Sequence, residues 1–256
     1  NVNDCEIVFN IIKGKDEKNA TSLFLKKDPE EKVKKLSNPQ NSMNFGTSKT
    51  KSFEGIIIGI PKLGARKEIW EMVMKQVELV TMRNGWKKED CEIKHIDLGI
   101  QTYYPINYVE FFSGTRKFDG RKYGLKIEDS CGEEVLRRIL GGGEISKAEH
   151  AGRYYHRALN AKNILKKEFE KAFKECDVIV MPTVPRIPHK FGEEISLEDM
   201  YNYDTLTVLA NIAEIPGISV PCGEIIEGKD VIPIGIQILA KCGDDNFLLD
   251  VAKFFN

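Results

Sequence analysis

The feature that most constrains the fold is an alternation of strand-like and helix-like segments that starts near residue 55. The run Gly55–Ile60 is fully apolar and stops at Pro61, which is typical of a buried strand. Residues 66–85 follow with apolar side chains at helical spacing, and Gly85 is a typical helix end. Residues 91–98 resemble another strand. A strand, a helix and a strand in succession predict a βαβ unit, and therefore a parallel sheet.

The alternation continues to the C-terminal end of the sequence. Residues 132–140 predict a short helix that the glycines 141–143 end. Ser146 and Glu149 have the spacing of a capping box, which would open a helix that runs to about residue 176. The fold class is therefore α/β, with one sheet covered on both faces. The remaining predicted elements are a strand, a helix, two strands and a final helix, at 177–181, 201–214, 218–220, 232–239 and 244–255.

Composition and charge exclude several classes of protein. The 256 residues include 38 basic and 39 acidic side chains, so we expect no long-range attraction to nucleic acid or to an anionic membrane. The six cysteines form no Cys-x-x-Cys pair, which argues against zinc and favours a reduced, intracellular protein. No apolar run of about 18 residues is present, so no membrane span is predicted.

The first 54 residues differ from the rest. Residues 1–14 predict a short helix that Asn3 or Asp4 caps and Gly14 ends, with an apolar stripe. Residues 15–54 are polar and are interpreted as a linker. Phosphate or RNA binding is the less favoured alternative there, because acidic residues are interleaved with the lysines. Since no earlier element precedes the apolar helix, the chain is expected to be a piece of something longer.

Few residues point to chemistry by themselves. No nucleophile-elbow, P-loop or metalloprotease pattern is present, and the four histidines lie apart. Ser219 and Cys222 are possible nucleophiles in a reactive loop bracketed by prolines. A buried strand is the favoured interpretation of this segment. In that strand the Ser219 hydroxyl would form a local hydrogen bond, and Cys222 would be a small buried thiol. The Arg137–Arg138 pair before the three glycines either offsets the carbonyl dipole of a helix end or grips a carboxylate. Asp204 lies near a predicted helix start, where a helix cap is the favoured interpretation. These features leave the function open.

Longer segments resemble a known family. Residues 216–223 and 232–239 (Pro-Gly-Ile-Ser-Val-Pro-Cys-Gly and Ile-Pro-Ile-Gly-Ile-Gln-Ile-Leu) resemble the C-terminal half of the amidase-signature enzymes. Residues 117–124, 132–140 and 200–204 are similar to one branch of that family, the A subunit of the glutamyl-tRNA(Gln)/aspartyl-tRNA(Asn) amidotransferases.

The resemblance implies an amidase-signature fold, with a mixed central sheet covered by helices on both faces. Residues 1–14 would be the end of the N-terminal amidase half, 15–54 the linker and 55–256 the C-terminal amidase region. Residues 218–220 would form a short central strand that Pro221 ends. Leu209 and Glu214 depart from the pattern, because the family often has proline and glycine at these positions.

The resemblance also implies a function. The complete A subunit would release ammonia from glutamine, and a partner subunit would use ATP and magnesium to amidate misacylated Glu-tRNA(Gln) or Asp-tRNA(Asn). The B and C subunits of the amidotransferase would be its partners in a cytoplasmic heterotrimer, with tRNA bound mainly by the partner. This chain itself would bind no metal or cofactor. The family's catalytic serine, second serine and lysine would lie upstream, so no catalytic residue is assigned here and the chain alone is expected to be inactive.

Substrate binding is what the resemblance carries onto this chain. Arg138 matches the family arginine that grips the α-carboxylate of glutamine, and Asp204 matches the aspartate that accepts from its α-ammonium group. Tyr103 matches a tyrosine near the same pocket. A cation and an anion held apart would select a free amino acid over a plain amide. The alternatives are an amidase of the same family acting on a small amide without tRNA, and a binding module without catalysis.

Overall fold

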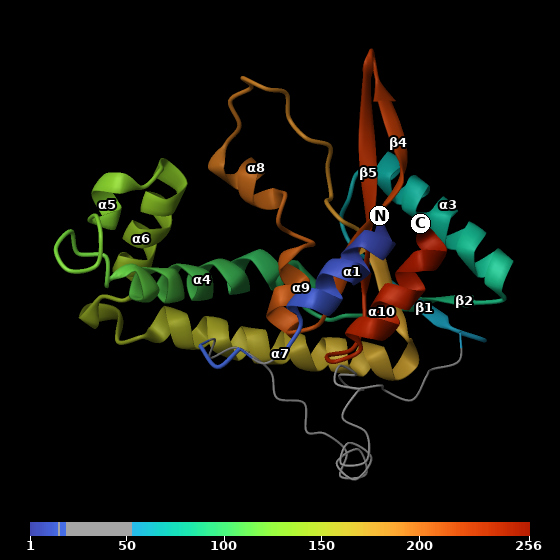
Figure 1. Cartoon of the computed structure of the whole chain (residues 1–256), viewed down its shortest axis with the longest axis horizontal. Helices are drawn as coiled ribbons and strands as arrows, with labels where there is room; N and C mark the ends of the chain where they lie inside the picture. Colours follow the sequence, from blue (N-terminus) through green and yellow to red (C-terminus); the bar gives the residue numbers. More distant parts are fainter. Residues whose placement is uncertain (15, 19–52) are drawn as a thin grey trace, which may run out of the picture.

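A computed structural model describes residues 1–14, 16–18 and 53–256 (Figure 1). Most of the predicted linker 15–54 therefore lies outside the described residues. In the part of the chain that is described, no helix combines the length and the apolar character needed to cross a membrane.

A five-stranded mixed sheet lies at the centre, in the order β2-β1-β3-β5-β4. β1 (Ile57–Pro61) pairs in parallel with β2 (Lys87–Cys91) and with β3 (Val178–Pro182). β5 (Asp230–Leu239) runs antiparallel to β3 and to β4 (Gly217–Glu227). The predicted βαβ unit is thus confirmed, and the two antiparallel pairings make the sheet mixed.

Alternate residues of β3 belong to two separate apolar clusters. Val178 and Val180 pack in one cluster with side chains of α3 (Lys67–Asn84) and α10 (Asp245–Ala252). Ile179 and Met181 pack in the other cluster with side chains of α7 (Arg153–Glu175) and α9 (Val208–Ala213). Because side chains alternate between the faces of a strand, the two clusters are the two faces of the sheet. The predicted α/β class, with both faces covered, is confirmed.

A helical arm extends from the sheet (Figure 1). It consists of α4 (Gly99–Thr115) and α6 (Glu133–Ile145), with the first half of α7 alongside α4. The other elements among the described residues are α1 (Val2–Ile12), η1 (Ile96–Leu98), α5 (Ile127–Ser130), η2 (Ala148–His150), α8 (Leu197–Asn202) and η3 (Lys253–Phe255).

The strand predicted at 91–98 is wrong, because β2 lies four residues earlier and four of its five side chains are exposed. An exposed edge strand needs no apolar alternation. Residues 99–115 form α4, which the sequence did not predict. This helix has no apolar stripe, so its sequence lacks the helical period. It also contains Pro105, a residue that usually argues against a helix interior.

The glycines 141–143 do not end a helix, because α6 continues through them to Ile145. They lie where α6 crosses α4. A Cβ on Gly142 would stand 2.0 Å from the carbonyl oxygen of Tyr108, and one on Gly141 would stand 2.7 Å from the ring of Tyr108. The missing side chains let the two helices approach closely, and this packing outweighs the weak helix propensity of glycine.

Two helix boundaries were also predicted wrongly. Ser146 is the residue after α6, and α7 starts only at Arg153, after Gly152 at φ +70°. The helix predicted at 201–214 is broken between Asn202 and Val208. In that gap the hydroxyls of Thr205 and Thr207 donate to backbone carbonyls three residues earlier, which offers the backbone an alternative to helix.

β4 is a long edge strand, whereas a short central strand that ends at Pro221 was predicted. Pro221 pairs with Gly235, and the register shifts between Pro221 and Gly223. A strand at the sheet edge tolerates the missing N–H of proline, and a bulge absorbs the irregularity.

Both ends of the described chain differ in detail from the prediction. Asn1, rather than Asn3 or Asp4, caps α1 by accepting from the backbone N–H of Asp4. At the other end the helix predicted at 244–255 stops at Ala252, and residues 253–255 form η3.

Candidate functional site

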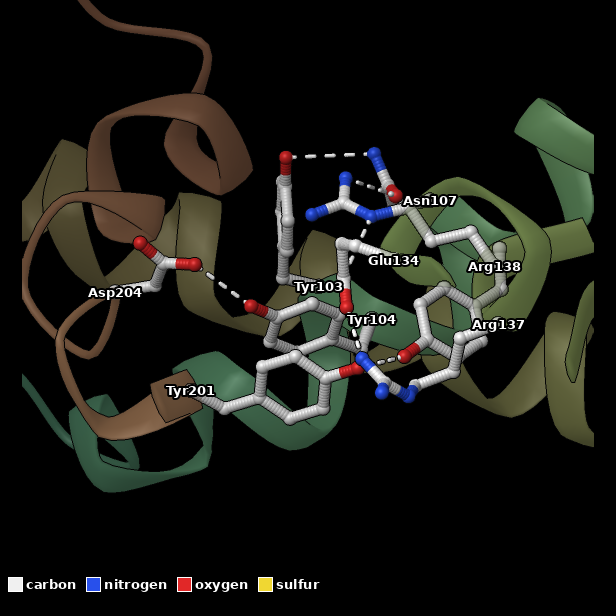
Figure 2. A network of polar contacts seen from close by, with 9 residues as sticks. Tyr103, Tyr104, Asn107, Glu134, Arg137, Arg138, Tyr201 and Asp204 are labelled. Carbon is white, nitrogen blue, oxygen red and sulfur yellow. Dashed lines mark hydrogen bonds and ion pairs between the residues drawn. The ribbon is translucent and has the colours of Figure 1, made fainter. Parts of the chain in front are cut away.

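Arg138, Asp204 and Tyr103 lie in one region of polar contacts, where α6 and the turn between α8 and α9 meet the side of α4 (Figure 2). Arg138 comes from the middle of α6, Tyr103 from the first half of α4, and Asp204 from the turn. The three residues are 35 to 101 positions apart in the sequence, and the fold brings them together.

Arg138 is held from two sides and is 28% exposed. Its Nε donates to Oε1 of Glu134 at 3.0 Å, and its Nη1 donates to Oδ1 of Asn107 at 3.3 Å. Burial disfavours the charged guanidinium, but the bond to Glu134 and its negative charge outweigh this and raise the pKa of Arg138. Since a guanidinium has five N–H groups, three are left for a ligand.

Asp204 is half-buried and accepts a hydrogen bond from the hydroxyl of Tyr104, with 2.6 Å between Oδ2 and the phenolic oxygen. Burial first, and then this bond, raise the pKa of Tyr104 well above its usual value, so its hydroxyl remains a donor. The aspartate keeps Oδ1 as a further acceptor. Asp204 is therefore oriented by α4, as Arg138 is.

Tyr103 lies between the two charges in the view of Figure 2. Its hydroxyl accepts from Nδ2 of Asn107 at 3.4 Å, and its ring meets that of Tyr104 edge to face. A cation and an anion on either side of an aromatic ring suit a small zwitterion, because the ring can contact the apolar part of the ligand.

Comparison with known proteins places the chain in a family. The family model described as Amidase matches residues 1–249. The chain belongs to the amidase family. Among curated amidase-family relatives, the A subunit of glutamyl-tRNA(Gln) amidotransferase from Methanocaldococcus jannaschii is 41% identical over 257 aligned positions, which cover 98% of this chain and 53% of the relative. The chain thus spans about half the length of the curated relatives it matches.

Solved structures of amidase-family proteins share the fold of this chain. The crystal structure of the A subunit of glutamyl-tRNA(Gln) amidotransferase from Thermotoga maritima has a TM-score of 0.70 and 26% identity, covering 99% of this chain and 50% of that one. A bacterial aryl acylamidase of the amidase signature enzymes has a TM-score of 0.72 at 18% identity, covering all of this chain and 51% of the other, which shows the shared fold alone. The predicted amidase-signature fold and the resemblance to the amidotransferase A subunit are both confirmed.

Several residues of this amidase-family site were not predicted from the sequence. Glu134 lies one turn before Arg138 and forms ion pairs with both Arg137 and Arg138. Its spacing from the arginines, three and four residues, is the signal that was available. Tyr104 and Asn107 gave no comparable signal, because their partners are far away in the sequence. The hydroxyls of Tyr108 and Tyr201 form a further hydrogen bond, which joins α4 to α8.

The candidate nucleophiles have other roles. The Ser219 hydroxyl hydrogen-bonds that of Thr183 at 2.6 Å, across Gly235 of the neighbouring strand. The local bond predicted for Ser219 is therefore wrong, because its partner lies on another segment. Cys222 is half-buried against an apolar cluster, and burial raises the pKa of its thiol to about 11, so it is protonated at neutral pH. Cys222 thus packs against apolar side chains as expected, but it is half-buried and not fully buried as predicted.

Two further features lie apart from the predicted site residues. A cavity of about 620 Å³ between α3 and β4 is lined by Met72, Gln76 and Cys222 among others, and by none of Arg138, Asp204 and Tyr103. Among the described residues, Glu144, Glu149 and His150 are a group that could hold a metal ion. They are near the surface, however, and Lys147 already pairs with Glu144 at 2.6 Å.

Proposed function

We propose that this chain is the substrate-holding part of the glutaminase subunit of a tRNA-dependent amidotransferase. The observation that carries the proposal is that Arg138 and Asp204 lie on either side of Tyr103, and each shares a hydrogen bond with a side chain of α4. The identity to relatives named as the A subunit of glutamyl-tRNA(Gln) amidotransferase supports the choice of substrate.

The charges match free glutamine. Two of the remaining N–H groups of Arg138 would bind the α-carboxylate, and Oδ1 of Asp204 would accept from the α-ammonium group. Each charge-assisted contact would contribute about 1.5–3 kcal/mol to binding. The side-chain amide would then extend from the site toward the catalytic serines and lysine. These residues belong to the part of the subunit that the relatives have in addition to the matched half.

The complete enzyme would use the released ammonia in a second reaction. A partner subunit would activate misacylated Glu-tRNA(Gln) or Asp-tRNA(Asn) with ATP and magnesium, and ammonia would convert it to Gln-tRNA(Gln) or Asn-tRNA(Asn). The assembly would be a cytoplasmic heterotrimer with the B and C subunits. This chain contributes amino-acid recognition, and the partner contributes most of the contacts to tRNA.

The test compares glutamine with analogues that each lack one charge, using the complete glutaminase subunit in complex with its partners. Arg138→Ala is expected to lower kcat/KM for glutamine about 10- to 100-fold. It should leave kcat/KM for 4-aminobutanamide unchanged, because this compound has no α-carboxylate. Asp204→Asn should likewise lower kcat/KM for glutamine and leave kcat/KM for glutaramate unchanged, because glutaramate has no α-ammonium group.

Arg137→Ala is the matched control, because Arg137 also pairs with Glu134 but has no contact with Asn107 in the described structure. An equal loss for glutamine and 4-aminobutanamide in Arg138→Ala would contradict the proposal. Equal use of both compounds by the unaltered protein would instead indicate an amidase for small amides. The chain alone should release no ammonia from glutamine.

A further inference from the structure

One side chain of α4 contacts both Arg138 and Tyr103. The Asn107 carbonyl oxygen Oδ1 accepts from Nη1 of Arg138 at 3.3 Å, while its amide nitrogen Nδ2 donates to the hydroxyl of Tyr103 at 3.4 Å. The opposite orientation of the amide would set an N–H donor against the N–H groups of Arg138, so the guanidinium fixes which way the amide points.

The geometry points to Asn107 as a positioning residue for the amino-acid site, which sets the direction of the Arg138 guanidinium and of the Tyr103 hydroxyl together. This inference rests on the proposed function, because it deals with how the same site recognises an α-carboxylate. Asn107 needs no contact with the ligand for this role.

The two anchors of Arg138 are chemically different, and the difference suits this role. Glu134 takes the Nε–H as a carboxylate, and Asn107 takes one Nη1–H as a neutral amide. Together they fix the plane of the guanidinium, since the two bonds use different nitrogens of a rigid, flat group. A second carboxylate at position 107 would hold the group equally well but would cancel the charge that attracts the ligand.

The close crossing of α4 and α6 makes the contact possible. Gly142 lies four residues after Arg138 on α6, so the two positions share one face of the helix. A Cβ at Gly142 would stand 2.0 Å from the carbonyl oxygen of Tyr108, the residue next to Asn107. The glycine contact therefore sets the separation of the two helices that the Arg138 side chain bridges.

Asn107→Leu tests the inference, because leucine has a similar shape and no hydrogen-bonding group. In the complete glutaminase subunit, bound to its partners, the variant is expected to raise KM for glutamine about 5- to 10-fold. This is less than the loss in Arg138→Ala, because the guanidinium stays in place and keeps its bond to Glu134. We expect kcat to stay within about twofold, and the turnover of 4-aminobutanamide and the melting temperature to stay unchanged. If Asn107 served folding alone, the variant would lower the turnover of both substrates and the melting temperature.

Coupling between the two residues gives the decisive measurement. If Asn107 acts on the ligand through Arg138, the change Asn107→Leu costs much less when Arg138→Ala is present than when it is absent. Asn107→Asp should raise KM for glutamine more than Asn107→Leu, because its carboxylate competes with the ligand for Arg138. An unchanged KM in Asn107→Leu, or additive losses in the double variant, would overturn the inference. If Arg138→Ala itself fails to separate glutamine from 4-aminobutanamide, the proposed function fails instead.

Discussion

The sheet and the helical arm are held together by different forces. The sheet buries apolar side chains from both faces, and all four residues Val178 to Met181 of β3 are fully buried. The arm places half-buried polar groups between its helices and brings α4 and α6 together through glycines. The sheet is therefore stabilised mainly by burial, whereas the arm uses close backbone contact and oriented hydrogen bonds to shape a site.

The largest expected effect tests the sheet side of this comparison. Phe169 of α7 is 1% exposed and packs on one face of the sheet, so Phe169→Ala should lower the free energy of unfolding by about 3–5 kcal/mol. Denaturant unfolding of the chain measures this loss. The folded fraction of the complete subunit should still discriminate glutamine from 4-aminobutanamide as before. Altered discrimination would mean that the two regions are not separable.

A smaller loss of stability with a larger effect on the site is expected in the arm. Gly142→Ala adds a methyl group where the Tyr108 carbonyl oxygen would be 2.0 Å away, which should cost about 1–3 kcal/mol as the helices move apart. Since Arg138 bridges these helices, discrimination between glutamine and 4-aminobutanamide should fall as well. Kinetics with both substrates, together with denaturant unfolding, check this.

Gly114→Ala is the matched control on α4, because a Cβ there would meet nothing within 4 Å. It should stabilise the chain by about 0.5–1 kcal/mol through helix propensity and leave both substrates unaffected. Retained discrimination in a folded Gly142→Ala protein would show that the glycine contact does not position Arg138.

The same difference between regions explains what could be predicted from the sequence. The apolar run at 57–60, the helix with Val73 and Val77, and the strand at 178–181 were predicted within a residue or two. In a buried helix or strand, the spacing of apolar residues follows the face that is buried, and this spacing can be recognised in a single sequence. β2 and α4 lack that periodicity, because β2 is an exposed edge and the apolar side chains of α4 are not gathered on one face of the helix.

The candidate site was predictable only in part. Arg138, Asp204 and Tyr103 were identified through the resemblance to a family, since a lone arginine or aspartate near a helix end has a sufficient structural explanation. Tyr104 and Asn107 could not be found, because their hydrogen bonds join α4 to residues 100 and 31 positions away. Such contacts follow from tertiary packing, which local patterns do not contain.

The smallest expected effect concerns Glu214, where the middle of α7 meets the C-terminal end of α9. Glu214 has a φ of +57°, which suits glycine, the residue that the family resemblance leads us to expect there. Its carboxylate pairs with Lys162 at 2.8 Å and with Lys166, and these two bonds lower its pKa from 4.5 to about 2. The ion pairs thus offset some of the backbone strain and join the C-terminal end of α9 to α7.

The pH dependence of stability tests this junction. A lowered pKa in the folded state means that the contribution is fully present above about pH 4.5 and is lost as the pH falls toward 2. Because Glu214 is 44% exposed, solvent screening limits the contribution to about 1 kcal/mol or less. Glu214→Gln should therefore be less stable than the unaltered chain at pH 7 by that amount, and the gap should narrow by about pH 3. Glu214→Gly should be more stable than Glu214→Gln, because glycine removes the strain that glutamine keeps. A gap between the unaltered chain and Glu214→Gln that is the same at both pH values would show that packing, and not the ion pairs, joins α9 to α7.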